Sequence, residues 1–154
     1  MRILFLSAWY PFPANNGSKL RIYNLLKGLS QNHEIHLISF TDEVHVEKSE
    51  LLEICASVEA VPWKENQLSG IKRLSAKFAL TPFSFLDTYS TQMVQAINQL
   101  LDQYDFDVVI ASQIKTASYA PYFRGLPAVF EEVELGVMYE QFASASTYLS
   151  LIHI

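Results

Sequence analysis

Several residue types and motifs that mark common protein classes are scarce or absent in this chain of 154 residues. The single cysteine, Cys55, excludes an intrachain disulfide and a multi-cysteine metal site. The four histidines lack the spacing of metal ligands, so we assign no metal. The formal net charge of −5 argues against nucleic-acid binding driven by charge. The sequence contains neither a long apolar run nor the pattern of a secretory signal, and we expect a cytoplasmic protein.

The composition is that of a well-packed globular domain, with half of the residues hydrophobic and 18% charged. Strand-like apolar runs alternate with amphipathic segments along the whole chain. Strands are predicted at 1–7, 34–40, 58–62, 107–111 and 127–130, and helices at 18–30, 46–56, 68–80, 117–122 and 134–148, with a further helix that is capped by Asp87 or Ser90 and runs to about residue 104. This alternation predicts an α/β fold with a Rossmann-like doubly wound parallel sheet. Cys55 falls in the second predicted helix, where we expect a buried, inert thiol.

The loop after the first strand is the first place to look for chemistry, because ligands of open α/β sheets bind at the carboxyl ends of the strands. It ends in Asn16, Gly17 and Ser18, which suit the start of a helix and the close approach of a phosphate or an acceptor hydroxyl. The alternative is a plain turn in which Ser18 caps the helix. Arg21 either points toward the site or is solvated, and Leu20 is expected to face the sheet. Neither a G-x-G-x-x-G fingerprint nor a P-loop is present.

Two later strands are also followed by polar side chains at the same predicted edge. Ser112 and Gln113 follow the strand at 107–111 and could hydrogen-bond sugar hydroxyls, although an ordinary helix start explains them equally well. Glu131, Glu132 and Glu134 follow the last strand. Their carboxylates suit acceptor binding or acid–base chemistry, and the alternative is a set of acids that stabilise a helix amino terminus.

Residues 63–85 are rich in basic and aromatic side chains. Such a segment suits peripheral contact with the inner face of an anionic membrane, or binding of a lipid-linked acceptor. The alternative is a core helix with a solvated basic face.

The pattern of the first forty residues resembles the amino-terminal domain of family 4 glycosyltransferases. The residues that carry the resemblance are 1–6, Pro11-Phe12-Pro13, Asn16-Gly17, Arg21, Asn24-Leu25-Leu26, Leu29 and 33–38. Members of this family have the GT-B architecture, in which two Rossmann-like domains face each other across a cleft. The resemblance extends to about residue 148.

The resemblance implies transfer of a sugar from a nucleotide-sugar donor to a glycan or lipid-linked acceptor, with retention of anomeric configuration and without a cofactor or metal. It places Asn16, Gly17 and Ser18 near the donor phosphates and the acceptor, with Arg21 at a frequent basic position behind them. Gln113 and Glu132 would lie on the acceptor side, and Glu132 and Glu134 are the candidate catalytic carboxylates.

The chain matches only one of the two domains of such an enzyme. We expect residues 1–148 to form the acceptor-side domain, residues 149–154 to be a non-native tail, and the carboxy-terminal donor-binding domain to be absent, so that the fragment is inactive alone. The alternative is a stand-alone Rossmann-like ligand-binding or regulatory module without catalysis.

Overall fold

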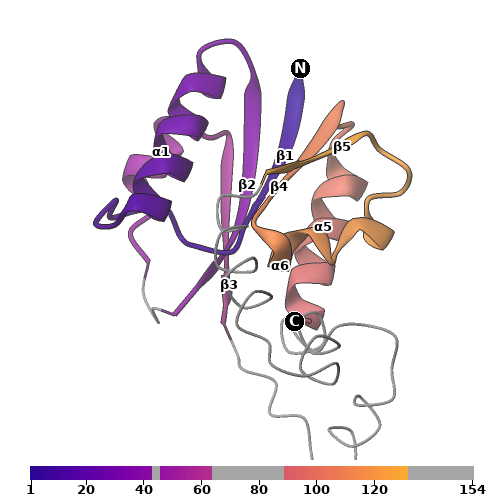
Figure 1. Ribbon diagram of the computed structural model, residues 1–154. Helices are drawn as coiled ribbons and strands as arrows, with labels where there is room; N and C mark the ends of the chain where they lie inside the picture. Colours follow the sequence, from indigo (N-terminus) through magenta and orange to yellow (C-terminus); the bar gives the residue numbers. More distant parts are fainter. Residues whose placement is uncertain (43–45, 64–88, 132–154) are drawn as a thin grey trace, which may run out of the picture.

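The chain folds around one parallel β-sheet, in a computed structural model that describes residues 1–42, 46–63 and 89–131 (Figure 1). The five strands are β1 (Arg2–Ser7), β2 (Glu34–Thr41), β3 (Ser57–Pro62), β4 (Val108–Ser112) and β5 (Ala128–Glu131). All neighbouring strands pair in parallel, in the order β3-β2-β1-β4-β5. The predicted α/β, Rossmann-like fold is therefore confirmed.

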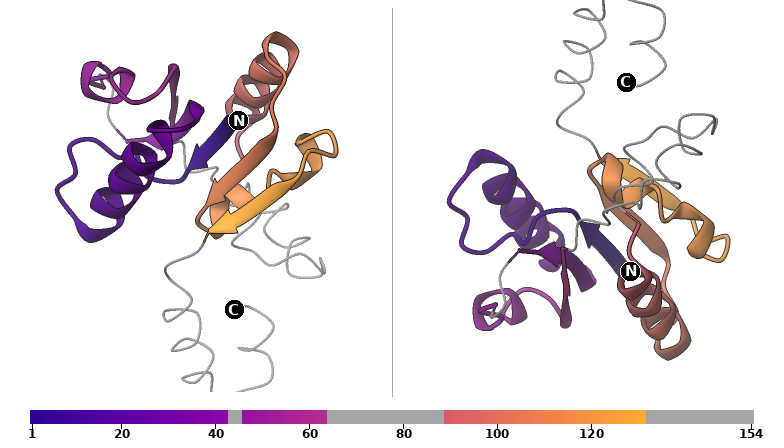
Figure 2. Two further views of the ribbon diagram at one scale, coloured as in Figure 1. Left: turned by 90° about the horizontal axis from the view of Figure 1, so that it is seen from above. Right: turned by 90° about the horizontal axis from the view of Figure 1, so that it is seen from below.

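Helices flank the sheet on both faces (Figure 2). The helical segments are α1 (Gly17–Ser30), α2 (Ser49–Leu52), α5 (Thr91–Gln103), α6 (Ile114–Ala117) and the 3₁₀ turn η1 (Ala120–Tyr122). Because side chains alternate along a strand, Phe5 of β1 packs with Leu26 of α1, whereas its neighbour Leu4 packs with Ile97 of α5. The apolar run in β1 is thus buried on both faces, as a central parallel strand requires.

Helix α1 begins one residue earlier than predicted because Asn16, not Ser18, is its N-cap. The Asn16 side-chain oxygen accepts a hydrogen bond from the Lys19 backbone N–H at 2.9 Å. Ile22 and Leu26 are the buried residues of the helix. Leu20 is 49% exposed, so the prediction that it faces the sheet was wrong. It lies two residues, or about 200° of helical rotation, before Ile22 and therefore on the opposite side.

The second predicted helix is much shorter than the pattern at 46–56 indicates. α2 spans only Ser49–Leu52, and the residues before it are not helical. The carbonyl of Glu47 accepts a hydrogen bond from the Tyr10 hydroxyl at 2.9 Å, a tertiary contact that local periodicity cannot anticipate. Cys55 lies in the turn after the helix and is buried, as expected, and burial raises the pKa of its thiol to about 12.

The remaining differences are small or lie outside the described residues. Ser90 caps α5, and β4 and β5 each begin and end one residue later than predicted. The helix predicted at 117–122 was wrong in its bounds: α6 ends at Ala117, where the prediction begins, and only the 3₁₀ turn η1, which contains Pro121, falls inside the predicted range. The helices predicted at 68–80 and 134–148 and the tail at 149–154 lie outside the described residues.

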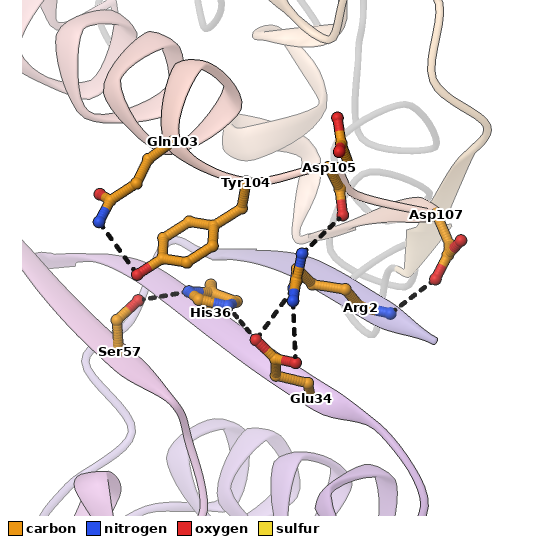
Figure 3. Close-up of polar contacts among 8 residues, drawn as sticks. All are labelled: Arg2, Glu34, His36, Ser57, Gln103, Tyr104, Asp105 and Asp107. Atoms are coloured by element: carbon orange, nitrogen blue, oxygen red, sulfur yellow. Dashed lines mark hydrogen bonds and ion pairs between the residues drawn. The ribbon is translucent and has the colours of Figure 1, made fainter.

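At the amino-terminal edge of the sheet, a polar network joins three neighbouring strands (Figure 3). The Arg2 Nε of β1 donates to the Glu34 Oε1 of β2 at 2.9 Å, and the same oxygen lies 3.0 Å from His36 Nε2. The other ring nitrogen of His36 lies 2.8 Å from the Ser57 hydroxyl of β3. The buried imidazole also packs on the Tyr104 ring, with centroids 4.3 Å apart. This edge is held together by its own side chains.

Candidate functional site

The opposite, carboxyl-terminal edge of the sheet carries a cavity of about 290 Å³. Residues that follow β1, β2, β3 and β4 contribute to its wall, among them Trp9, Asp42, Trp63 and Lys115, and Lys19 comes from the first turn of α1. The strand order reverses direction in sequence between β1 and β4, which makes this edge the topological switch point of the sheet. Ligands of open α/β folds bind at such a point.

Two indole rings and an ammonium group dominate one side of the cavity. Lys115 Nζ lies 4.4 Å from the centre of the Trp63 ring and 5.5 Å from that of Trp9. Trp63 packs edge-on against Phe40 of β2, with centroids 4.8 Å apart. Its backbone N–H also donates to the Thr41 carbonyl at 2.7 Å, so this tryptophan is fixed by both backbone and side chain. The cation therefore lies near two aromatic rings, within the distance range of cation–π contacts.

Sequence reasoning missed Trp9 and Lys115 as site residues, and it considered Trp63 only as part of the segment 63–85, for which it left membrane contact, binding of a lipid-linked acceptor and a core helix open. The signal that could have identified all three is their position within a few residues of a strand's carboxyl end. Residues 64–85, the rest of that segment, lie outside the described residues.

Gln113 has an unusual backbone conformation directly after β4, with φ 71° and ψ 151°. This region is almost restricted to glycine and costs other residues energy. The side chain is only 5% exposed, and its Oε1 accepts a hydrogen bond from the Ala8 backbone N–H at 3.0 Å. The Gln113 backbone N–H donates to the Glu131 carbonyl at 2.8 Å. Gln113 thus links the ends of β1, β4 and β5, and its predicted contact with an acceptor stays a prediction.

Arg21 and Glu131 form an ion pair between α1 and the end of β5. The Ser112 hydroxyl donates to the second carboxylate oxygen of Glu131 at 2.6 Å. This carboxylate is therefore held on both sides and largely buried, with a side-chain exposure of 15%. The structure thus brings together two sequence-predicted residues, Arg21 and Glu131, by pairing them with each other. Glu132 and Glu134 lie outside the described residues.

The three predicted loop residues lie at the start of α1, close in sequence to the cavity-lining Lys19. Asn16 is occupied as the N-cap, and neither it nor Ser18 lines the cavity. A Cβ atom added to Gly17 would meet no atom within 4 Å, so the fold itself does not require glycine there. A role for Gly17 in admitting a ligand stays a prediction.

Within residues 1–42, 46–63 and 89–131, no group of three or more potential metal ligands is assembled. None of the helices described has both the length and the apolar character needed to cross a bilayer. No protein-family model matches the chain, and no curated protein is significantly similar to it. Its class is therefore defined by fold, as a Rossmann-like α/β domain with a cavity at the switch point.

Proposed function

We propose that this chain is the acceptor-side domain of a retaining glycosyltransferase with GT-B architecture. The full enzyme would transfer a sugar from a nucleotide-sugar donor to a glycan or lipid-linked acceptor. The observation that carries the proposal is the cavity at the carboxyl edge, lined by Trp9, Trp63, Lys19, Lys115 and Asp42. The loop after β1, where we first look for chemistry, contributes Ala8, Trp9 and Tyr10 to it, whereas Asn16, Gly17, Ser18 and Gln113 do not line it.

The composition of the cavity suits a sugar ring. The indoles of Trp9 and Trp63 offer flat apolar surfaces for ring C–H groups, and the lysine and aspartate side chains offer donors and acceptors for hydroxyls. A volume of about 290 Å³ is at the lower end of the range for small-molecule pockets, which is roughly 300–1,000 Å³. This size favours a single sugar unit over a whole nucleotide-sugar.

The proposal assigns the donor mainly to a second domain beyond these residues. The chain has no glycine-rich phosphate fingerprint, and the guanidinium of Arg21 is already paired with Glu131. Glu132 and Glu134 remain the proposed catalytic carboxylates, with Gln113 and Glu132 on the acceptor side. Contact of residues 63–85 with the membrane would bring a lipid-linked acceptor to the cavity.

The chain's own tryptophans provide the test. Trp9 and Trp63 are the only two tryptophans, and both line the cavity, so intrinsic fluorescence reports on this site alone. We expect a saturable fluorescence change with methyl glucoside or methyl mannoside, and a much weaker response to UDP-glucose or GDP-mannose. The Trp63→Phe variant should keep the fold and lose part of the signal.

Two outcomes would contradict the proposal. Turnover of a nucleotide-sugar by residues 1–154 would show that the donor and catalytic machinery are complete within them. A flat response to all saccharides, together with binding of a non-saccharide ligand, would favour a stand-alone binding or regulatory module.

A further inference from the structure

Lys115 differs from most cations of the described chain in what surrounds it. Arg2, Arg21, Lys48 and Arg124 each form an ion pair with a carboxylate. Lys115 forms none with a described carboxylate; the residue is half-buried, and its ammonium nitrogen lies 4.4 and 5.5 Å from the ring centres of Trp63 and Trp9. An aromatic face stabilises a cation, but it leaves the ammonium N–H groups able to donate to an anion.

A second lysine of the same cavity is in a similar state. Lys19 lies in the first turn of α1 and also forms no ion pair with a carboxylate of the described residues. Among the described residues, Asp42 is the only acidic side chain that lines the cavity, against the two lysines. The described lining therefore carries two ammonium groups and one carboxylate and is positive, in a chain whose formal net charge is −5. Such a local reversal of sign attracts anions into the cavity and repels cations from it.

The surroundings of Lys115 also strengthen its interaction with an anion. The two indoles place apolar surface beside the ammonium group, and charge–charge interactions grow as the local dielectric constant falls. An anion at Lys115 would contact the aromatic rings through the rest of its molecule. A ligand that joins a flat ring to a negative group would satisfy both features at once.

We infer that the acceptor is an anionic saccharide, in which a phosphate or carboxylate substituent is held by Lys115 and Lys19 while the sugar ring contacts Trp9 and Trp63. This inference rests on the proposed function, in which the ligand of the cavity is the acceptor. It adds the chemical class of that acceptor and assigns Lys115 as the residue that selects it. A sugar phosphate and a uronic acid share this chemistry, and the test separates them.

The experiment compares charged and neutral probes of one size in tryptophan-fluorescence titrations of the 154-residue chain. The probes are glucose, glucose 6-phosphate, glucuronate, inorganic phosphate and UDP-glucose. We expect glucose 6-phosphate or glucuronate to bind at least about tenfold more tightly than glucose, with an affinity that falls as salt is added. Whichever of the two binds more tightly identifies the anionic group.

Variants assign the effect to the two lysines. Lys115→Gln and, separately, Lys19→Gln should weaken binding of the charged sugars by about tenfold and weaken glucose binding much less, whereas Lys115→Arg should keep most of the preference. Lys27→Gln is the matched control, because Lys27 lies in the last turn of α1 and does not line the cavity. Circular dichroism confirms that each variant is folded.

The outcomes separate the inference from the proposed function. Equal affinity for glucose and the charged sugars, or charged-sugar binding that Lys115→Gln leaves unchanged, overturns the inference and leaves the glycosyltransferase proposal standing. Displacement of glucose 6-phosphate by UDP-glucose would assign the anion site to the donor and also overturn the inference. Inorganic phosphate binding as tightly as the sugar phosphate, with no response to glucose, would contradict recognition of a saccharide and thus both proposals.

Discussion

Gln113 shows how a single residue can organise the carboxyl edge of the sheet. Its backbone lies in a region that disfavours side chains, yet its buried amide oxygen is the partner of the Ala8 N–H. The β1 loop begins at Ala8 and carries Trp9 into the cavity. The strained backbone of Gln113 therefore occurs together with the Gln113–Ala8 hydrogen bond, which helps to position Trp9. Strain of this kind is typical of functional sites.

Replacing Gln113 by alanine and by glycine separates these two effects. Both variants lose the hydrogen bond to Ala8 N–H and leave a buried donor unpaired, which costs about 1–3 kcal/mol. Glycine also relieves the strained backbone, so we expect Gln113→Gly to be more stable than Gln113→Ala by about 1–3 kcal/mol. Urea denaturation measures both free energies of unfolding. Equal stabilities would show that the positive φ stores no strain.

At the scale of elements, α1 connects the sheet core to the site. Its buried side chains Ile22 and Leu26 pack on the sheet, while its first turn presents Lys19 to the cavity and Arg21 to Glu131. The position of that turn depends on where the helix begins. Asn16 sets this point through its bond to the Lys19 N–H.

The cap can be tested by two alanine substitutions two residues apart. Asn16→Ala should lower the free energy of unfolding by about 1 kcal/mol, because one helix N–H loses its partner. Ser18→Ala is the control and should change stability by less than about 0.5 kcal/mol, since Ser18 lies inside the helix. Thermal or urea unfolding gives both values. The reverse ranking would mean that Ser18 is the cap.

At the scale of the whole molecule, the two edges of the sheet have different chemistry. The amino edge is closed by the network of Arg2, Glu34, His36 and Ser57 (Figure 3), whereas the carboxyl edge contains the cavity. The hydrogen bond from Arg2, and to a lesser extent that from His36, lowers the pKa of the Glu34 carboxyl. The Arg2–Glu34 hydrogen bond also raises the pKa of Arg2. The network therefore stabilises the fold in a pH-dependent manner.

The direction of this pH dependence follows from linkage. Folding lowers the pKa of Glu34, so the unfolded chain binds the proton more tightly than the folded chain does. The stabilisation is therefore complete above the unfolded pKa of about 4.3, and it is lost as the pH falls through the folded pKa. We expect the stability difference between the parent and Glu34→Gln to shrink steadily below about pH 4.

Urea denaturation at a series of pH values measures this difference. Glu50→Gln is the matched control, because Glu50 is an exposed glutamate of α2 without an ion pair to a described residue. A parent–variant difference that stays constant down to pH 2 would contradict the assignment of the acid-sensitive contribution to Glu34.

Local pattern was a good guide to elements whose character is decided within a few residues. The apolar run at Ile3–Leu6 identified β1, and the spacing of Met93, Ile97 and Leu100 identified the buried face of α5. Pattern failed at 46–56, where only Ser49–Leu52 is helical, and at Leu20, which was placed on the wrong side of its helix. Local pattern defines the ends of elements less well than their interiors.

By itself, the sequence determined that strands and helices alternate, because hydrophobic periodicity and turn residues act locally, and it predicted chemistry in the loops at one edge. Only the tertiary structure decided which strands are neighbours and which side chains meet. Trp9, Trp63 and Lys115 are far apart in the sequence but meet at the cavity. Likewise, Arg21 of α1 forms an ion pair with Glu131 at the end of β5. These contacts form because parallel pairing brings the carboxyl ends of successive strands to one edge, and no local pattern encodes that order.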